Sequence, residues 1–449
     1  MGNLKVGASK KCISPKEDML PSPQAVLNGD AQYTWVRKDI YVRAIAIDNG
    51  KKKLVFIVTE TNNANVLTIR KEVAKKNNIP EENVFMCNSH NHSATNTLDL
   101  DYHNTDWDHD VPEVVFKYSK YVMDLEIQCA NEAFQNMQPA RYAYATGNSY
   151  INCNRDEELN NGRWIFGRNF ERPSDKTLAI LKFEDMEGHL IAALMNYAVH
   201  ATMCFRVKDE NGNMCVSGDL AGDICEFMEE AYSKDNAVVA WTIAAAGNQT
   251  AILEFFHEYH PDGTYVPDER YNHYSGTYMW KLCEHLAQKQ GMDALKIMSG
   301  MTKTHDDMKI EVVDRQLQVP GTKVEGFGFE QLCDDRNIDE SKIHNVDDDK
   351  IYNLRLKLIT LDDIALFGVN FEFMCESGLR IKEKSPLKNL MIITCADKSI
   401  EGAPYLVDKW GYEHHTPSYY RNGVRDAMTE EVSTEALMEM FEERLRRED

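Results

Sequence analysis

Three histidines and one glutamate stand at the ends of apolar segments, and imidazole and carboxylate groups together can bind a metal ion or move a proton. His90 and His92 follow the apolar run 84–87, and His200 follows the run 195–199. On an extended backbone, residues two apart such as His90 and His92 point to the same face. A single histidine after a buried strand is usually structural, but two such strand ends in one chain favour a functional site.

Glu372 follows the apolar run 364–371 and precedes an amphipathic stretch. A carboxylate buried at the end of a strand is costly unless it meets a cation or hydrogen-bond donors. A plainer interpretation stays open, because a helix N-terminus also favours a carboxylate. The question that the sequence poses is whether Glu372 completes a metal site with the histidines.

The elements that must position these residues are predicted from apolar periodicity and turn residues. We expect strands at 41–48, 53–59, 83–90, 177–183, 190–199, 237–244, 351–360, 364–370 and 390–395. We expect helices at 65–76, 111–137, 219–233, 274–290 and 429–446, and one that begins near 374. The polar segment 327–350 is predicted to lie on the surface. Because no repeat or linker divides the chain, we expect one mixed α/β unit over 1–449.

Composition limits the class of protein. The chain has 449 residues, of which 43% are hydrophobic and 27% charged, as in ordinary soluble proteins. No apolar run approaches the roughly 18 residues that span a bilayer. The net charge of −22 disfavours nucleic acid and anionic membranes as partners. The 11 cysteines form no C-x-x-C pair and the first residues lack an apolar secretory segment, so we expect a cytoplasmic protein acting on a small molecule.

In order along nearly the whole chain, these segments resemble the neutral/alkaline non-lysosomal ceramidase family, specifically its catalytic N-terminal domain. The segment S-H-N-H-S is similar to the family's S-H-T-H-S motif, and the region around Glu372 is similar to its V-P-G-E region. The segments that carry the resemblance are L-K-V-G-A-S-K-K-C-I-S-P at 4–15, S-H-N-H-S at 89–93, N-C-N-R at 152–155, N-Y-A-V-H-A-T at 196–202, V-S-G-D at 216–219 and G-L-R-I-K at 378–382.

The resemblance implies stacked mixed β-sheets flanked by helices, without the C-terminal immunoglobulin-like domain of secreted members. It also implies one zinc ion per chain, held by His90, His200 and Glu372, with His92 and Arg155 facing the substrate. Two imidazoles and a carboxylate leave an open position, as in catalytic zinc sites. Zinc lowers the pKa of bound water and polarises a carbonyl, while His92 would move a proton or donate to an oxyanion. Arg155 would bind a carboxylate or an acyl oxygen.

The loop that carries the family's serine is altered here. The segment G-N-Q-T-A at 247–251 replaces the family pattern G-D-x-S/N-P, with Thr250 at the serine position. The sequence identifies no base to activate Thr250, so we expect its hydroxyl to donate a hydrogen bond at most. Asn248 and Gln249 are expected to contact the substrate. The family's tyrosine ligand has no clear counterpart, which leaves Tyr405, Tyr412 or water for the fourth metal position.

The sequence therefore predicts a zinc-dependent hydrolase that acts on an amide-type C–N bond, with metal-bound water as the nucleophile. Because the motif loops are altered, we expect a small polar substrate and weak or absent ceramide hydrolysis. Two alternatives stay open. The metal could serve an isomerase or lyase acting on a sugar-acid-like substrate, or the chain could be a non-catalytic, metal-dependent binding protein. Released amine would distinguish a hydrolase from both.

Overall fold

The structure is a computed structural model. It describes residues 2–23, 32–62, 66–95, 97–98, 100, 112–160, 162, 164–205, 207–254, 277–325, 344–397, 405–413, 423–424 and 426–446. No helix in this described part of the chain is long and apolar enough to cross a membrane.

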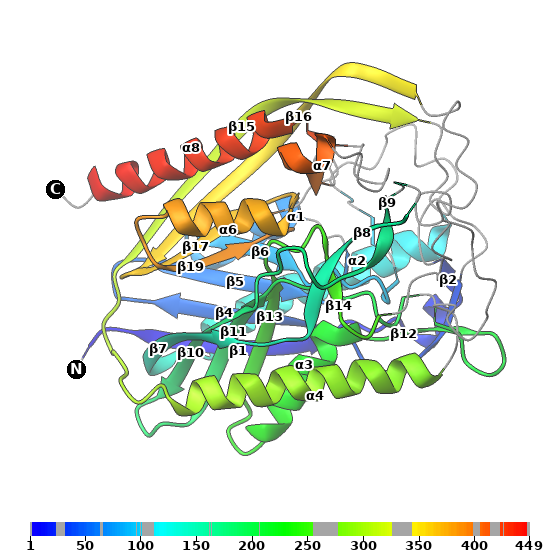
Figure 1. Cartoon of the computed structure of the whole chain (residues 1–449). Helices are drawn as coiled ribbons and strands as arrows, with labels where there is room; N and C mark the ends of the chain where they lie inside the picture. Colours follow the sequence, from blue (N-terminus) through cyan, green and yellow to red (C-terminus); the bar gives the residue numbers. More distant parts are fainter. Residues whose placement is uncertain are drawn as a thin grey trace.

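An eight-stranded sheet lies at the centre of the molecule (Figure 1), with the strand order β13-β11-β10-β7-β1-β4-β5-β6. Its strands are β1 (Lys5–Cys12), β4 (Tyr41–Asp48), β5 (Lys53–Thr59), β6 (Val84–Asn88), β7 (Gln138–Asn148), β10 (Thr177–Asp185), β11 (Leu190–Tyr197) and β13 (Val238–Ile243). The pairs β5–β6 and β11–β13 are parallel. Followed through the antiparallel pairings between them, β5 and β6 run opposite to β11 and β13. The segments that follow β6 and β11 nevertheless meet, because the His92 amide donates to the Ala201 carbonyl at 3.2 Å.

A seven-stranded sheet with the order β18-β20-β21-β15-β16-β17-β19 packs on the first. Its strands are β15 (Ile310–Glu325), β16 (His344–Leu361), β17 (Ile364–Val369), β18 (Glu372–Phe373), β19 (Asn389–Ile393), β20 (Tyr405–Leu406) and β21 (Gly423–Val424). Two three-stranded sheets complete the strands of the described residues: β2 (Ser22–Pro23), β3 (Gln32–Val36) and β12 (Met214–Val216), and β8 (Asn152–Glu158), β9 (Trp164–Asn169) and β14 (Gln249–Ala251).

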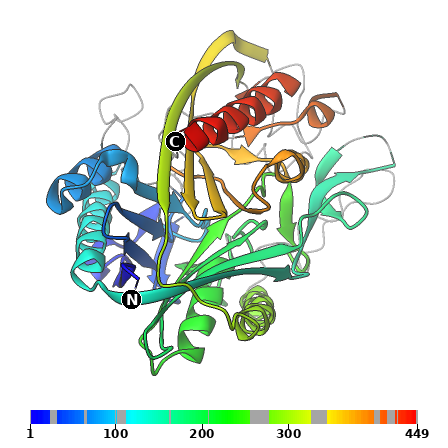
Figure 2. The ribbon, with the colours of Figure 1, turned by 90° about the vertical axis from the view of Figure 1, so that its left-hand side faces the viewer.

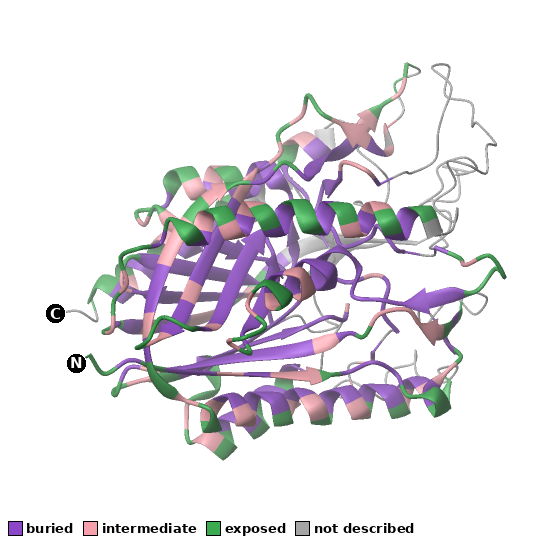
Figure 3. Cartoon of the chain, turned by 90° about the horizontal axis from the view of Figure 1, so that it is seen from below, coloured by how far each residue is buried: buried purple, intermediate pink, exposed green. Residues whose placement is uncertain are grey.

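Helices cover the outer faces of both large sheets (Figures 1 and 2). They are α1 (Val66–Asn77), α2 (Glu113–Gln135), α3 (Asp219–Ala231), α4 (Thr277–Ser299), α6 (Cys375–Lys384), α7 (Lys409–Glu413) and α8 (Asp426–Arg446). Helices α1 to α4 pack on the eight-stranded sheet, and α6 and α8 pack on the seven-stranded sheet. Figure 3 shows that the strands are largely buried, whereas these helices expose their outward faces.

The core between the two large sheets follows from the alternation of side chains along each strand. Ile45 and Ile47 of β4 face the seven-stranded sheet, where they join Leu366 of β17 in one apolar cluster. Val42 and Ala44 of the same strand point the other way, toward α2. Fully burying one such aliphatic side chain contributes roughly 1.5–3 kcal/mol, so this double-sided burial fixes the strand register and the docking of the sheets.

Most predicted elements are present, with shifted ends. Helix α4 continues to Ser299, beyond the expected end at 290. Strand β6 ends at Asn88, before His90. Residues 344–350, expected in a polar surface segment, begin strand β16; the rest of that segment, 327–343, lies outside the described residues. The sequence did not predict β15, because its apolar positions are interrupted by charged and polar residues.

Candidate active site

His90, His200 and Glu372 converge at the edge where the two large sheets meet. His90 follows β6 and His200 follows β11, while Glu372 begins β18 of the other sheet. All three side chains are buried, and the rings of His90 and His200 lie 4.9 Å apart. The prediction that His90 and His92 lie on extended backbone and for that reason face the same way is wrong, because His90 has a left-handed backbone with φ 57°. It therefore lies in the turn after the strand, not on extended backbone.

Nε2 of each histidine lies against one oxygen of the same carboxylate. His200 Nε2 is 3.1 Å from Glu372 Oε2, and His90 Nε2 is 3.2 Å from Glu372 Oε1. The His90 contact lacks hydrogen-bond alignment, so this buried nitrogen has no hydrogen-bond partner among the described residues. Neighbouring ligands of a tetrahedral zinc site, bound at about 2.0–2.1 Å, are about 3.3 Å apart. The two imidazoles and the carboxylate therefore fit a metal ion in both donor type and spacing.

Charge coupling at these residues agrees with a site for a cation. Burial works against the charged form of Glu372, yet His90 and His200 hold its pKa well below the usual range. Burial likewise lowers the pKa of His90, but the Glu372 carboxylate outweighs it and the pKa rises to about 9. Burial and Arg155 lower the pKa of His200 to about 4. His90 is therefore protonated beside the ionised Glu372 carboxylate, and a bound metal ion would replace that proton.

His92 lies beside His90 and His200, but its ring nitrogens do not lie against the Glu372 carboxylate as theirs do. Its ring packs edge to face on His90, with centroids 4.6 Å apart, and is 6.0 Å from the ring of His200. Its buried Nε2 has no hydrogen-bond partner in the described part of the chain. Burial and the neighbouring His90 and His200 hold its pKa well below the usual range. His92 is therefore a neutral imidazole at neutral pH, able to accept a proton at Nε2.

Arg155 and Tyr405 lie next to Glu372. Strands β18 and β20 pair in parallel with Glu372 opposite Tyr405, which brings the phenol to the site. Arg155 is buried, and its Nη2 donates to the Tyr405 hydroxyl at 3.2 Å and to the Gly247 carbonyl at 2.5 Å. Of the two tyrosines considered for the fourth metal position, Tyr405 is thus adjacent to a proposed ligand. The side chain of Tyr412 lies outside the described part.

Thr250 is buried on β14, and its hydroxyl donates to Glu254 Oε2 at 2.6 Å. Thr202, two residues after His200, donates to the same oxygen at 2.8 Å. Glu254 Oε1 has no hydrogen-bond partner among the described residues. Burial raises the pKa of Glu254 to about 7, against the effect of these two hydrogen bonds. The sequence analysis identified no base near Thr250 and did not single out Glu254. The structure places this carboxylate, four residues after Thr250, at hydrogen-bond distance from its hydroxyl.

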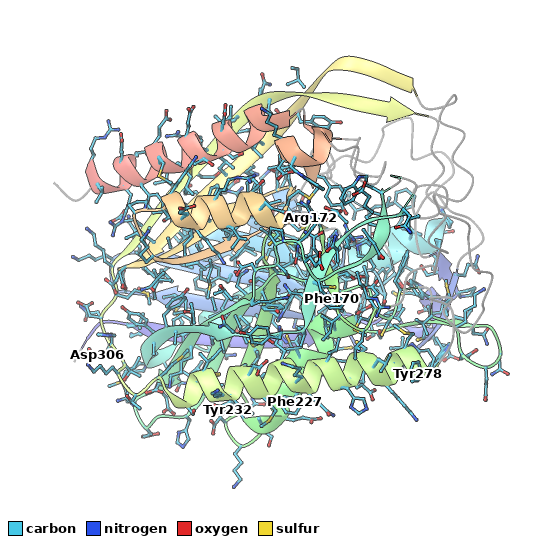
Figure 4. All side chains as sticks on the ribbon, viewed as in Figure 1. Phe170, Arg172, Phe227, Tyr232, Tyr278 and Asp306 are labelled. Carbon is cyan, nitrogen blue, oxygen red and sulfur yellow. The ribbon has the colours of Figure 1, made fainter. Side chains whose placement is uncertain are left out.

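Asn248 and Gln249 use their side chains inside the protein. Asn248 Nδ2 donates to Glu376 Oε2 at 2.8 Å, and Asn248 Oδ1 accepts from the Cys375 amide at 2.9 Å. Arg172, labelled in Figure 4, reaches the same carboxylate on α6 and donates to Glu376 Oε1 at 2.6 Å. Gln249 Oε1 accepts from Ser174 at 2.6 Å. A substrate would have to replace these contacts to bind either amide.

One backbone carbonyl and one thiol contact the Nδ1 atoms of the two histidines. The Gln249 carbonyl lies 3.1 Å from His200 Nδ1, which leaves Nε2 of that ring facing Glu372. On the other histidine, Cys395 Sγ lies 3.6 Å from His90 Nδ1. Partners of this kind fix the tautomer and ring orientation of metal-binding histidines. No spacing pattern could have revealed Cys395, because it is 305 residues from His90 in the sequence.

Comparison with known proteins identifies the family. The family model described as neutral/alkaline non-lysosomal ceramidase, N-terminal, matches residues 28–256, just over half of the chain. No curated protein matches the chain.

Solved structures share the fold. A ceramidase complexed with C2 has a TM-score of 0.72 at 15% identity, covering 97% of this chain and 74% of its own. The neutral ceramidase from Pseudomonas aeruginosa has a TM-score of 0.70 at 16% identity, covering 97% and 73%. These similarities confirm the mixed α/β fold of stacked sheets flanked by helices. The chain belongs to the neutral/alkaline non-lysosomal ceramidase family and is a ceramidase-like hydrolase of an amide bond.

Proposed function

We propose that this chain is a zinc-dependent hydrolase that cleaves the amide C–N bond of a small polar substrate. The observation that carries the proposal is the approach of two imidazole Nε2 atoms to the two oxygens of Glu372, at 3.1 and 3.2 Å. Neutral ceramidases are metal-dependent as a family, and His90, His92 and His200 form a group able to hold an ion.

The donor set supports zinc in particular. Two neutral imidazoles and one carboxylate are the protein ligands of several catalytic zinc sites, whereas magnesium and calcium prefer sites made of oxygen ligands. When bound, zinc would activate a water molecule and polarise the carbonyl of the substrate. We assign His90, His200 and Glu372 as its ligands, and leave the fourth position to water or Tyr405.

The remaining side chains have distinct tasks in the proposed reaction. His92 holds Nε2 free to accept a proton from the nucleophile and to return it to the departing nitrogen. The Arg155 guanidinium keeps the Tyr405 phenol beside Glu372 and supplies positive charge where an oxyanion would develop. Thr250 gives its hydrogen to Glu254, so that its oxygen is left to accept from the substrate.

A buried carboxyl group in contact with Asn248 supports a polar substrate, since Asp156 Oδ2 accepts from Asn248 Nδ2 at 3.3 Å. Asp156 follows Arg155 in β8, and its Oδ1 has no hydrogen-bond partner among the described residues. Burial, and then the Glu376 carboxylate, raise the pKa of Asp156 to about 7. A hydrocarbon chain packed against such a group would leave it unsatisfied, which is costly. A substrate with hydrogen-bonding groups would satisfy it.

We also propose a cytoplasmic location and no nucleic-acid or membrane partner. The net charge of −22 supports the absence of an anionic partner, and the cysteine pattern supports a reducing compartment. Cell fractionation with the protein recovered in the membrane fraction would contradict this part of the proposal.

The test is amine release by zinc-loaded protein. The substrates are a panel of N-acetyl amino acids and, separately, a fluorescent ceramide in detergent micelles, with Glu372→Gln as the isosteric control that removes the anionic ligand. We expect kcat/KM on the best polar amide to exceed that on ceramide by roughly tenfold or more, and the control to be inactive.

Each outcome decides one part. Efficient turnover of ceramide with none of the polar panel would overturn the substrate class but keep the hydrolase. Turnover without released amine would favour the isomerase or lyase. Turnover by the metal-free protein, or by Glu372→Gln, equal to that of the zinc-loaded wild type would remove zinc from the proposal.

A further inference from the structure

We infer that the Cys395 thiol is a positioning residue of the metal centre: it accepts a hydrogen bond from His90 Nδ1 and holds the ring with Nε2 toward the metal. The inference rests on the proposed function, because it concerns how this chain orients one proposed zinc ligand. It adds a residue that neither the motifs nor the donor set identify.

The contacts of the two His90 nitrogens give the first argument. Nδ1 lies 3.6 Å from Cys395 Sγ, and Nε2 lies 3.2 Å from Glu372 Oε1. A neutral imidazole that binds a metal through Nε2 must carry its proton on Nδ1. The Nδ1–H group then donates to sulfur, which is a weak acceptor. Without that acceptor, a buried N–H would be left unsatisfied.

An independent observation shows that this ring is prepared for a ligand. His90 Nε2 is buried and has no hydrogen-bond partner in the described part of the chain, although the carboxylate of Glu372 lies nearby. His200 has the same arrangement, with the Gln249 carbonyl on Nδ1 and Glu372 at Nε2. Each of the two histidine ligands therefore has its own partner at Nδ1, a carbonyl for His200 and a thiol for His90.

The segment that carries Cys395 is held by strands of both large sheets. Its amide donates to the Phe371 carbonyl at 3.2 Å, next to Glu372. The following residues donate to strands on either side: Ala396 to the Val369 carbonyl at 2.9 Å, and Asp397 to the Met86 carbonyl at 2.7 Å. These bonds fix the backbone of Cys395 relative to His90 and Glu372, so that only rotation about its Cα–Cβ bond remains to place the thiol.

Backbone conformation gives a further argument. Cys395 has φ 54° and His90 has φ 57°, so two residues in side-chain contact both adopt the left-handed region. Residues with a Cβ rarely adopt it, because the conformation is strained for them. Such strain persists where the surrounding structure enforces it, and here it brings the thiol against the ring.

Two competing roles are separated by experiment. Buried cysteines often act as small apolar side chains, and Cys395 does belong to an apolar cluster. It could also bind the metal directly, since one ligand atom each of His90, Glu372 and Cys395 lie within 4.8 Å of one another. The position of Sγ on Nδ1 favours the positioning role over ligation, because Nε2 is the nitrogen that faces the carboxylate.

The experiment measures zinc affinity by competition with a chromophoric chelator. We compare the full-length wild type with Cys395→Ala, with Cys395→Asn, and with the control Cys129→Ala. Asparagine is close to cysteine in size, tolerates left-handed backbone and offers a carbonyl oxygen as acceptor. Cys129 is a buried thiol on α2 whose Sγ contacts the Ser9 carbonyl, away from the site. We expect Cys395→Ala to weaken zinc binding about tenfold, the lower end of such effects, and Cys395→Asn to restore most of the loss.

Spectra of the cobalt-substituted wild type and of cobalt-substituted Cys395→Ala distinguish positioning from ligation. Ligation by the thiolate would give a sulfur-to-cobalt charge-transfer band that disappears in Cys395→Ala, and this would overturn the positioning role. Equal zinc affinity of Cys395→Ala and the wild type, or an equal loss in Cys129→Ala, would overturn it too. If the wild type binds no zinc, the proposed function itself fails, which is a different result from a wild type that binds zinc as tightly as Cys395→Ala.

Discussion

Glu254 Oε2 accepts a hydrogen bond from the Thr250 hydroxyl, with 2.6 Å between the oxygens, in a buried cluster of polar side chains that also includes Thr202. The sequence placed Thr250 at the position of the family's serine but offered no base for it. The structure supplies a carboxylate at hydrogen-bond distance, with a pKa raised to about 7 by burial. Threonine is β-branched, which crowds its hydroxyl oxygen. We therefore expect this oxygen to bind the substrate and not to attack it.

Replacing Thr250 by alanine should slow the reaction by roughly tenfold to a hundredfold, in keeping with the loss of one hydrogen bond. Thr250→Ser keeps the hydroxyl and is the matched control, with activity close to that of the wild type. The measurement is kcat/KM for amine release. Complete inactivation, or a covalent intermediate trapped on Thr250, would show that the hydroxyl is the nucleophile.

His200→Ala should lose the metal ion. The substitution removes one of three proposed ligands, and the two that remain cannot hold zinc in competition with a chelator. Elemental analysis after dialysis measures the occupancy. His189→Ala is the control, because His189 is exposed and pairs with Asp185 instead. Full occupancy in His200→Ala would remove His200 from the ligand set.

For His92→Ala we expect the opposite pattern, with metal retained and turnover lowered by about 10²–10⁴-fold, the usual contribution of a general acid or base. The reason is that His92 contacts the rings of the proposed ligands but not the Glu372 carboxylate. Occupancy and kcat are measured on the same preparation. Loss of the metal would make His92 a ligand.

Glu126 of α2 predicts how stability depends on pH. Its carboxylate is buried without a hydrogen-bond partner of normal geometry in the described part, and burial raises its pKa to about 8, against the effect of the Thr59 hydroxyl. The folded protein therefore binds a proton that the unfolded chain releases near pH 4.3. The stabilisation is complete below that pH and is lost as the pH rises to about 8.

Glu126→Gln should flatten this dependence, because glutamine does not titrate. In wild type the slope between pH 5 and 8 should be up to about 1.4 kcal/mol of unfolding free energy per pH unit more negative than in Glu126→Gln. Urea titrations at a series of pH values measure it, with the exposed Glu82→Gln as the control. Parallel curves for wild type and Glu126→Gln would show that Glu126 is ionised in the folded protein.

The elements of the fold were predictable where periodicity is strong. The hairpin of β4 and β5, and helices α2 and α3, are close to their expected bounds because one face of each is uniformly apolar. Strand β15 was not predicted, since it is set by pairing with β16, in which Ile310 lies opposite Leu361, and not by a local pattern.

The site was predictable only where a short segment carries the side chain to a strand end, as with His90 and His200. Glu254, Cys395 and the register that sets Tyr405 beside Glu372 depend on contacts between distant segments. The sequence contains no local signal for such contacts. This is why the motifs indicate a family but not the hydrogen bonds that tune its site.

The proposed ligands come from two different sheets: His90 and His200 follow strands of the eight-stranded sheet, and Glu372 begins a strand of the seven-stranded sheet. A metal ion bound by these residues would cross-link the two large sheets. A packing defect between the sheets, such as the cavity left by Leu366→Ala, would then lower the affinity for the metal. Metal binding would therefore depend on correct docking of the two sheets, and only correctly folded molecules would become active.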